Sequence, residues 1–220
     1  MQTPLDFANW FLARVDRRAG DSITHLKLQK LLFYAQAWAL VLLGEPIFDE
    51  DFQAWQHGPV LRSVYDRFQG SGYQALSTPR RGAQSTFDPQ VEELLEDILR
   101  LYGEHSAKAL EDQTHREDPW VNARGGRPAN AACRTPISKE SMKNFFGAMF
   151  LEHGGPVIAP TPQGFRVTGT PFLDAGGNPL PPPADDGFPP PDHDDFDRAL
   201  SYGLSAVGRK RARKRQQRPE

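Results

Sequence analysis

The chain has 220 residues, of which 38% are hydrophobic and 10% aromatic, and its formal charge is −2, so it can bury one sizeable core. Its one cysteine, Cys133, excludes an intramolecular disulfide framework and a zinc site built on paired cysteines. No apolar run reaches the roughly 18 residues that span a bilayer, and the charges near the N-terminus lie within the first predicted helix, so we expect a cytoplasmic protein.

The chain opens with an amphipathic helix, predicted over residues 4–18. Apolar side chains recur there at three- and four-residue steps and form one stripe: Leu5, Ala8, Phe11, Leu12 and Val15. We expect this stripe to face a core.

A second helix follows, with Thr24 as its N-cap and Gly44 as its C-terminal stop before Pro46. Its main apolar stripe consists of Leu28, Leu31, Leu32, Ala35, Trp38, Ala39 and Leu42. Other apolar residues lie off this stripe, so most of the helix circumference is apolar. Such a helix is normally central, with neighbours on several sides. We therefore interpret the stripe as core and not as a binding site.

The next segment, residues 50–68, contains short elements. It predicts an extended piece, a turn at Gly58 and Pro59, and a helix of one to three turns.

Four helical segments complete the ordered part of the prediction. The first runs from Pro89, with Asp88 as its cap, to a stop at Gly103. The others cover residues 106–113, residues 118–124 with Asp118 as cap, and residues 138–151 with Met142, Phe145, Phe146 and Met149 inward. The fold class is therefore mainly α, a compact multi-helix single domain with a short extended segment.

Composition changes near residue 154, and we place a domain boundary there. Residues 1–153 form the helical domain. Residues 154–220 are rich in Gly and Pro, which favour irregular or extended chain over helix. Six aspartates lie between Asp185 and Asp197, and seven basic residues lie in 209–218. We expect this extension to be partly disordered.

The sequence contains no recognisable catalytic or metal-binding spacing. Its six histidines are scattered, and no phosphate-binding glycine loop, dinucleotide fingerprint or serine elbow is present. We therefore expect no cofactor, no metal and no enzymatic activity. An enzyme would need Cys133 or the histidines to converge in space.

Four segments together resemble the Panacea domain, the family that includes SocA-type antitoxins and phage-associated GepA-like proteins. They are "THLKLQKLLFYAQAW" (24–38), "FDEDFQAWQHGPVLRSVYDRF" (48–68), "THREDPW" (114–120) and "PISKESMKNFF" (136–146). The resemblance covers about residues 5–151, with the segments in the family's order.

The resemblance implies a small bacterial protein that neutralises a cognate protein toxin, encoded nearby, by binding it. In the SocA-type branch the antitoxin also acts as an adaptor that delivers its toxin to the ClpXP protease. The resemblance implies no active site.

Ten residues are candidates for contact with a partner. Three are polar residues of the apolar second helix, which either hydrogen-bond inside or face a partner, and the others lie on the following turns and short helices: Gln29, Lys30, Gln36, Trp55, His57, Arg62, Tyr65, Arg67, His115 and Trp120. For Trp55, His57, His115 and Trp120 a packed structural role is the competing interpretation.

Two other functions stay open on the sequence. A DNA-binding autoregulator needs basic residues on a recognition helix, which "PWVNARGGR" supplies sparsely. Without residues 182–220 the chain has 18 basic and 21 acidic residues, so its body has no basic excess for nucleic acid, and the basic tail predicts weak, non-specific binding at most. The second alternative is the enzyme that uses Cys133 or histidines.

Overall fold

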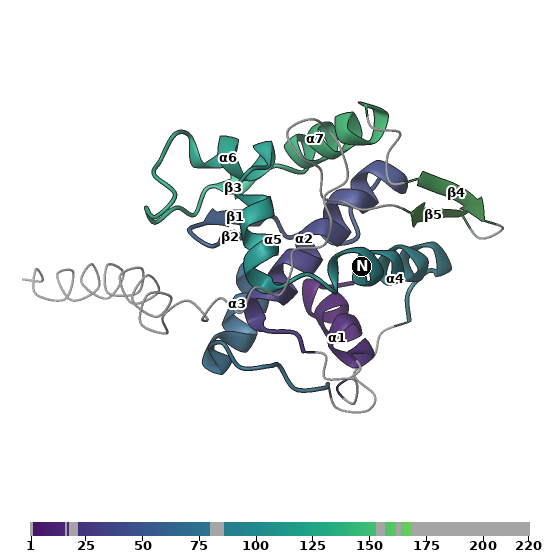
Figure 1. Cartoon of the computed structure of the whole chain (residues 1–220), viewed down its shortest axis with the longest axis horizontal. Coiled ribbons are helices and arrows are strands. Elements are labelled where there is room, and N and C mark those ends of the chain that lie inside the picture. The colour runs from purple at the N-terminus through teal and green to yellow at the C-terminus, as the bar shows by residue number, and fades with distance from the viewer. Residues whose placement is uncertain are drawn as a thin grey trace, which may run out of the picture.

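The computed structural model describes residues 2–15, 17, 22–79 and 86–152, and the backbone of two strands at 157–161 and 164–168. These residues form seven α-helices, one 3-10 turn and five short strands (Figure 1). The helices are α1 (Pro4–Arg14), α2 (His25–Leu42), α3 (Arg62–Phe68), α4 (Pro89–Tyr102), α5 (Ala107–Thr114), α6 (Asp118–Arg124) and α7 (Lys139–Glu152), and the 3-10 turn η1 is Gln69–Ser71. The prediction of a mainly α fold is confirmed.

Helix α2 runs through the centre of the molecule, as its apolar circumference predicts (Figure 1). It begins where the Thr24 hydroxyl accepts a hydrogen bond from the Lys27 amide at 3.3 Å, and Gly44 follows its end with φ +80°. Fourteen of its 18 residues are buried, and α1, α3, α4, α5, α7 and the sheet pack around it. The predicted core stripe is buried except for Leu42, which is partly exposed.

Helix α1 is shorter than predicted. It ends at Arg14, because Val15 at its C-cap has an extended backbone with φ −68° and ψ 122°. Phe7 and Trp10, which the predicted stripe omits, are also buried. The predicted end at residue 18 was therefore wrong.

Strands β1 (Phe52–Trp55) and β2 (Gly58–Val60) form an antiparallel hairpin, and β3 (Pro136–Ile137) pairs with the other edge of β1. The predicted extended piece is therefore confirmed, but the turn lies elsewhere. Trp55 pairs with Gly58, so the turn residues are Gln56 and His57. Gly58 belongs to β2 and has φ +93°, a backbone conformation that glycine adopts without strain.

The later helices begin close to their predicted starts. Asp88 caps α4 by accepting from the Gln90 amide at 2.9 Å, and Ser106 caps α5 by accepting from the Ala109 amide at 3.1 Å. For α6 the predicted cap was wrong by one residue. Asp118 is already in the helix, and Glu117 at the cap position makes no capping hydrogen bond with its side chain.

Aromatic side chains join α2 to α4 and α7 in the core. The rings of Tyr34 and Tyr102 stack with centroids 3.9 Å apart, and the Trp38 ring meets Phe146 edge-on at 5.4 Å. The Trp38 indole also donates a hydrogen bond to the Tyr102 hydroxyl at 2.8 Å. Trp38 of α2 therefore contacts both α4 and α7.

Two strands stand in the Gly/Pro-rich extension, β4 (Val157–Thr161) and β5 (Gly164–Thr168), which pair antiparallel. The acidic segment 185–197 and the basic segment 209–218 lie outside the described residues. The boundary at residue 153 stays a prediction. Within the described chain, no helix is long and apolar enough to cross a membrane.

Replacing Trp38 tests the central helix. We expect Trp38→Ala to lower the free energy of unfolding by about 3–5 kcal/mol, because it leaves a cavity at a fully packed site. Trp38→Phe is the matched control, since it keeps an aromatic ring and loses mainly the bond to Tyr102, at about 1 kcal/mol. Urea unfolding measures both, and a Trp38→Ala protein as stable as wild type would contradict the assignment to the core.

Candidate partner-binding face

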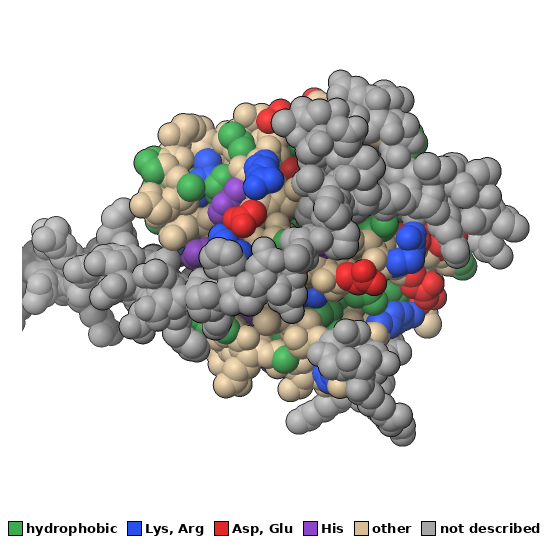
Figure 2. All heavy atoms as spheres, in the orientation of Figure 1, with side chains coloured by type: hydrophobic (Ala, Val, Ile, Leu, Met, Phe, Trp, Pro, Cys, Tyr) green, Lys and Arg blue, Asp and Glu red, His purple; other side chains and the backbone are tan. Residues whose placement is uncertain are grey.

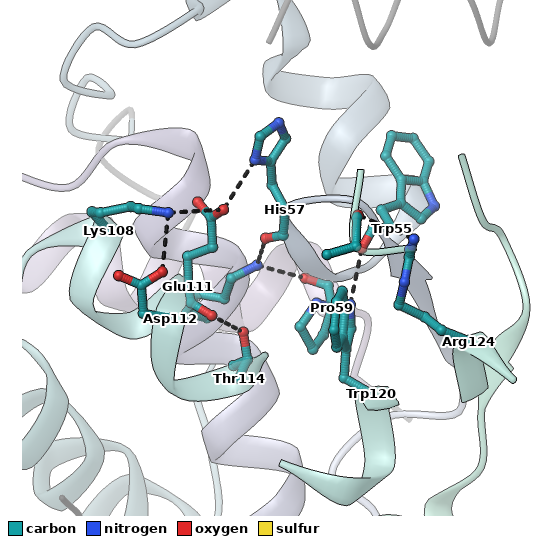
Figure 3. Close-up of polar contacts among 11 residues, drawn as sticks. Trp55, His57, Pro59, Lys108, Glu111, Asp112, Thr114, Trp120 and Arg124 are labelled. Carbon is teal, nitrogen blue, oxygen red and sulfur yellow. Dashed lines mark hydrogen bonds and ion pairs between the residues drawn. The ribbon is translucent and has the colours of Figure 1, made fainter. Parts of the chain in front are cut away.

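Eight side chains lie where the hairpin β1–β2 meets α3, α5 and α6, and we call this group the hairpin face. It consists of Trp55, His57, Arg62, Tyr65, Lys108, Glu111, His115 and Trp120. Figure 3 shows the part around His57, Glu111 and Trp120. In the space-filling view, histidine, acidic and basic side chains lie next to one another on the left half of the visible surface (Figure 2). The face therefore mixes both charges with aromatic rings.

Gln29 and Gln36 of α2 lie beneath the surface, where the side-chain amide of each bonds one backbone amide and one backbone carbonyl. Gln29 accepts from the Leu61 amide at 2.8 Å and donates to the Leu61 carbonyl at 3.3 Å. Gln36 accepts from the Ile47 amide at 3.0 Å and donates to the Phe48 carbonyl at 2.9 Å. Both side chains are buried, so they hold the segments that follow α2 and are not exposed to a partner.

Lys30 is also buried, with 0% of its surface exposed, and it holds the hairpin turn from below. Its ammonium group donates to the His57 carbonyl and, at 3.3 Å, to the Pro59 carbonyl. Burial lowers the pKa of Lys30 to about 7, and the negative charges of Glu111 and Glu117 oppose that shift. The position of His57 on the surface therefore depends on a buried amine.

Gly58 leaves the space that Lys30 occupies. A Cβ atom at this position would lie 2.5 Å from the Lys30 amine and 2.7 Å from the Thr114 hydroxyl oxygen. Both contacts are shorter than van der Waals packing permits, so a side chain here would displace Lys30 or Thr114, and the positive φ also favours glycine.

Aromatic and guanidinium groups cover the outer side of the hairpin. The Trp55 ring lies 4.8 Å from the Tyr65 ring, and Arg62 lies over Tyr65 at 5.8 Å. Arg134 lies over Trp55 at 5.6 Å. Trp, Tyr and Arg are the residue types that most often dominate protein–protein binding energy. The cluster therefore has the composition of an interface centre.

An ion network ties the turn to α5. His57 Nδ1 lies 3.1 Å from a Glu111 carboxylate oxygen, and Lys108 bridges Glu111 at 3.4 Å and Asp112 at 3.0 Å (Figure 3). Burial raises the pKa of Glu111, but the hydrogen bond and charge of His57 and the two lysine charges outweigh it and hold this pKa at about 2. Glu111 is therefore an anion at neutral pH, with its charge compensated inside the chain.

Trp120 and Arg124 of α6 fasten the other side of the hairpin. The Trp120 indole donates to the Trp55 carbonyl at 2.9 Å, and His115 stacks on Trp120 with centroids 4.1 Å apart. Arg124 donates to the Ala54 carbonyl at 3.0 Å and to carbonyls at 128, 129 and 131. Trp120 is buried, and burial also lowers the pKa of His115 to about 4. Buried Trp120 therefore supports the face from within, and half-buried His115 stacks on it.

Glu117 is a buried acid next to this support. Both the Tyr34 hydroxyl, at 3.1 Å, and the Gln113 amide, at 3.2 Å, donate to its Oε1. Its Oε2 is buried without a hydrogen-bond partner among the described residues. Burial raises the pKa of Glu117 to about 8, although these two donors and Lys30 oppose the shift. The folded state therefore favours the protonated acid.

The structure thus separates the ten candidate residues. Within the hairpin face, Trp55, His57, Arg62 and His115 are half-buried and reach the surface, whereas Tyr65 and Trp120 are buried. Gln29, Lys30 and Gln36 lie below the face. Arg67 is exposed on α3 and lines a separate cavity. Sequence reasoning missed Lys108, Glu111, Arg124 and Arg134. The spacing of Lys108 with Glu111 and Asp112 on one helix was the available signal, whereas nothing local marks Arg124 or Arg134.

The structure also describes the residues behind the two alternative functions, a DNA-binding autoregulator and an enzyme that uses Cys133 or histidines. Arg124, in the segment weighed as a recognition helix, is 1% exposed and bound to backbone carbonyls, so it cannot reach a phosphate. The Cys133 sulfur lies 3.6 Å from Arg127 and 3.4 Å from the Thr135 hydroxyl. Among the described residues, no group of three or more His, Cys, Asp or Glu side chains is placed to hold a metal ion.

Gly44 and Gly58 both have positive φ, but only Gly58 lies close to other side chains. Comparing alanine substitutions at the two positions therefore separates the cost of the close approach from the cost of backbone strain. Gly44→Ala adds a Cβ in open space at φ +80°, and we expect it to cost about 1 kcal/mol of stability. Gly58→Ala adds the same strain and the clash with Lys30, so we expect a loss of about 2–4 kcal/mol. Equal losses in urea unfolding would show that Lys30 moves aside without cost.

Glu117 also predicts a pH effect. Its pKa is raised on folding, from 4.5 to about 8, so its contribution to stability is present below pH 4.5 and is lost as pH rises toward 8. Glutamine mimics the neutral acid at every pH. We therefore expect wild type and Glu117→Gln to be similarly stable at pH 5 and wild type to be the less stable at pH 8. Urea midpoints at pH 5, 6, 7 and 8 measure this, and parallel profiles would contradict it.

Comparisons with known proteins show what this chain is similar to. Residues 28–121 match the family model described as "Antitoxin SocA-like, Panacea domain", a range that contains all ten candidate residues. The antitoxin SocA of Caulobacter vibrioides (strain NA1000 / CB15N) is 29% identical over 141 residues, which cover 56% of this chain and 72% of the relative. No solved structure matches this chain. The family match and the SocA alignment confirm the resemblance to SocA-type Panacea proteins, and the family match runs from the first turn of α2 to the middle of α6.

Proposed function

We propose that this protein is an antitoxin that neutralises a cognate protein toxin, encoded nearby, by binding it directly through the hairpin face. The observation that carries the proposal is the alignment with antitoxin SocA over 141 residues. All eight residues of the hairpin face lie within residues 28–121, the region matched by the family model.

The geometry of the hairpin face supports a role in binding. Its exposed side chains surround aromatic rings, and its backbone is held from below by Lys30, Gln29 and Arg124. A surface held in this way loses little conformational entropy when a partner binds, which favours affinity.

Charge reversal on this face tests the proposal. We expect Arg62→Glu to weaken toxin binding by about 10- to 100-fold, because Arg62 lies over Tyr65 and is partly exposed. The candidate toxin is the product of an adjacent gene that is toxic when expressed alone. Co-purification and isothermal titration measure binding, and growth under co-expression measures neutralisation.

Lys143→Glu is the matched control, because Lys143 is an exposed residue of α7, outside the hairpin face, and undergoes the same charge change. We expect it to bind and neutralise like wild type. Equal losses in both variants would indicate long-range electrostatics instead of contact. Normal binding by Arg62→Glu would place the contact surface elsewhere, and absence of any complex with wild type would refute the antitoxin proposal.

We further propose, on the resemblance alone, that inhibition includes delivery of the toxin to ClpXP. The same co-expression strains distinguish delivery from blocking, since delivery shortens the toxin half-life only when the protease is present. An unchanged half-life would leave blocking as the mechanism.

A further inference from the structure

A cavity of about 590 Å³ opens between α1, the end of α3 and the segment 76–79, away from the residues of the hairpin face. Its size lies within the range of ligand pockets, about 300–1,000 Å³. Nothing in the antitoxin proposal uses this cavity.

The lining of the cavity is apolar and neutral polar, with one positive charge. Leu5, Leu12, Phe68 and Leu76 supply apolar walls, and neutral polar groups such as Asn9 and Ser77 lie among them. Among the described lining residues, Arg67 is the charged one, and none is a carboxylate. The cavity is therefore suited to a ligand that joins apolar groups to negative charge.

A second guanidinium borders the same cavity. Arg17 donates to the carbonyl of Leu12 at 3.2 Å and to the carbonyl of Leu76 at 2.8 Å, and both of these residues line it. Arg17 is exposed and lies outside the apolar wall. The rim therefore favours an anionic chain that enters along it.

The chain itself contains a segment of the complementary composition. Residues 185–197 read "DDGFPPPDHDDFD", with six aspartates and two phenylalanines, Phe188 and Phe196. This segment therefore combines negative charge with aromatic side chains that the apolar walls can receive. We propose that residues 185–197 dock into this cavity, with a phenylalanine against the apolar walls and aspartates on Arg67 and Arg17.

The segment can reach the cavity. Residues 169–184 connect it to β5 and span up to about 50 Å when extended, whereas a body of this size is about 40 Å across. A tether of this length produces an effective concentration in the millimolar range, so even a weak contact becomes largely occupied.

Docking would place the acidic segment on Arg67, one of the residues predicted to contact a partner. The extension then acts as an internal competitor for that part of the surface. The inference concerns the isolated chain and does not depend on the antitoxin proposal.

Hydrogen–deuterium exchange on the full-length protein tests the docking. We expect amides of 185–197 to exchange about tenfold more slowly than in Arg67→Glu, where the positive charge in the cavity becomes negative. Replacing Phe188 and Phe196 together by alanine should release the segment to the same extent, because the apolar contact is lost. Urea unfolding confirms that each variant is folded.

Arg62→Glu is the matched control, since it makes the same charge change on α3 at a residue that does not line the cavity. We expect the segment to stay protected in this variant. Equal release by Arg62→Glu and Arg67→Glu would show diffuse attraction and overturn the proposal, as would wild-type exchange at the rate of an unstructured peptide. Protection that persists in the double phenylalanine variant would also overturn it.

Discussion

The structure depends on satisfying the polar groups of a helix that is buried on nearly every side. Helix α2 carries an amine and two side-chain amides into the interior, where an unpaired polar group costs roughly 1–3 kcal/mol or more. Each is paired with backbone of the segment that follows: Gln36 with residues 47 and 48, Lys30 with the hairpin turn, and Gln29 with Leu61. The route of the chain after α2 is thus set by polar bonds in addition to apolar packing.

The sequence predicted what local signals can encode. Thr24, Asp88 and Ser106 cap their helices by bonding amides two or three residues away, so each start could be read directly. The turn was misplaced because Gly58 and Pro59 are usual turn residues, whereas here Gly58 serves a contact with Lys30 from another element. The end of α1 was missed because polar residues continue the pattern past Arg14 without a stop signal.

The candidate face was predicted in part for the same reason. Trp55, His57 and Arg62 were found because the residues stand in one segment, and the structure places them together. Arg134 and Glu111 join them only through tertiary contacts, across 79 and 54 positions of chain. Burial of Lys30 could not be derived from composition, because its carbonyl partners become available only when the hairpin forms over it. Local sequence therefore predicts the members of a surface better than its layers.

The division between Lys30, Gln29 and Arg124 below and Arg62, Trp55 and Lys108 above has an evolutionary consequence. The buried set bonds backbone carbonyls and amides, which are present whatever side chains the surface carries. Under the proposed function, substitutions among the exposed residues alter which partner is recognised while the framework keeps its shape. Divergence of specificity in such a fold requires few changes, and those changes carry little risk of unfolding.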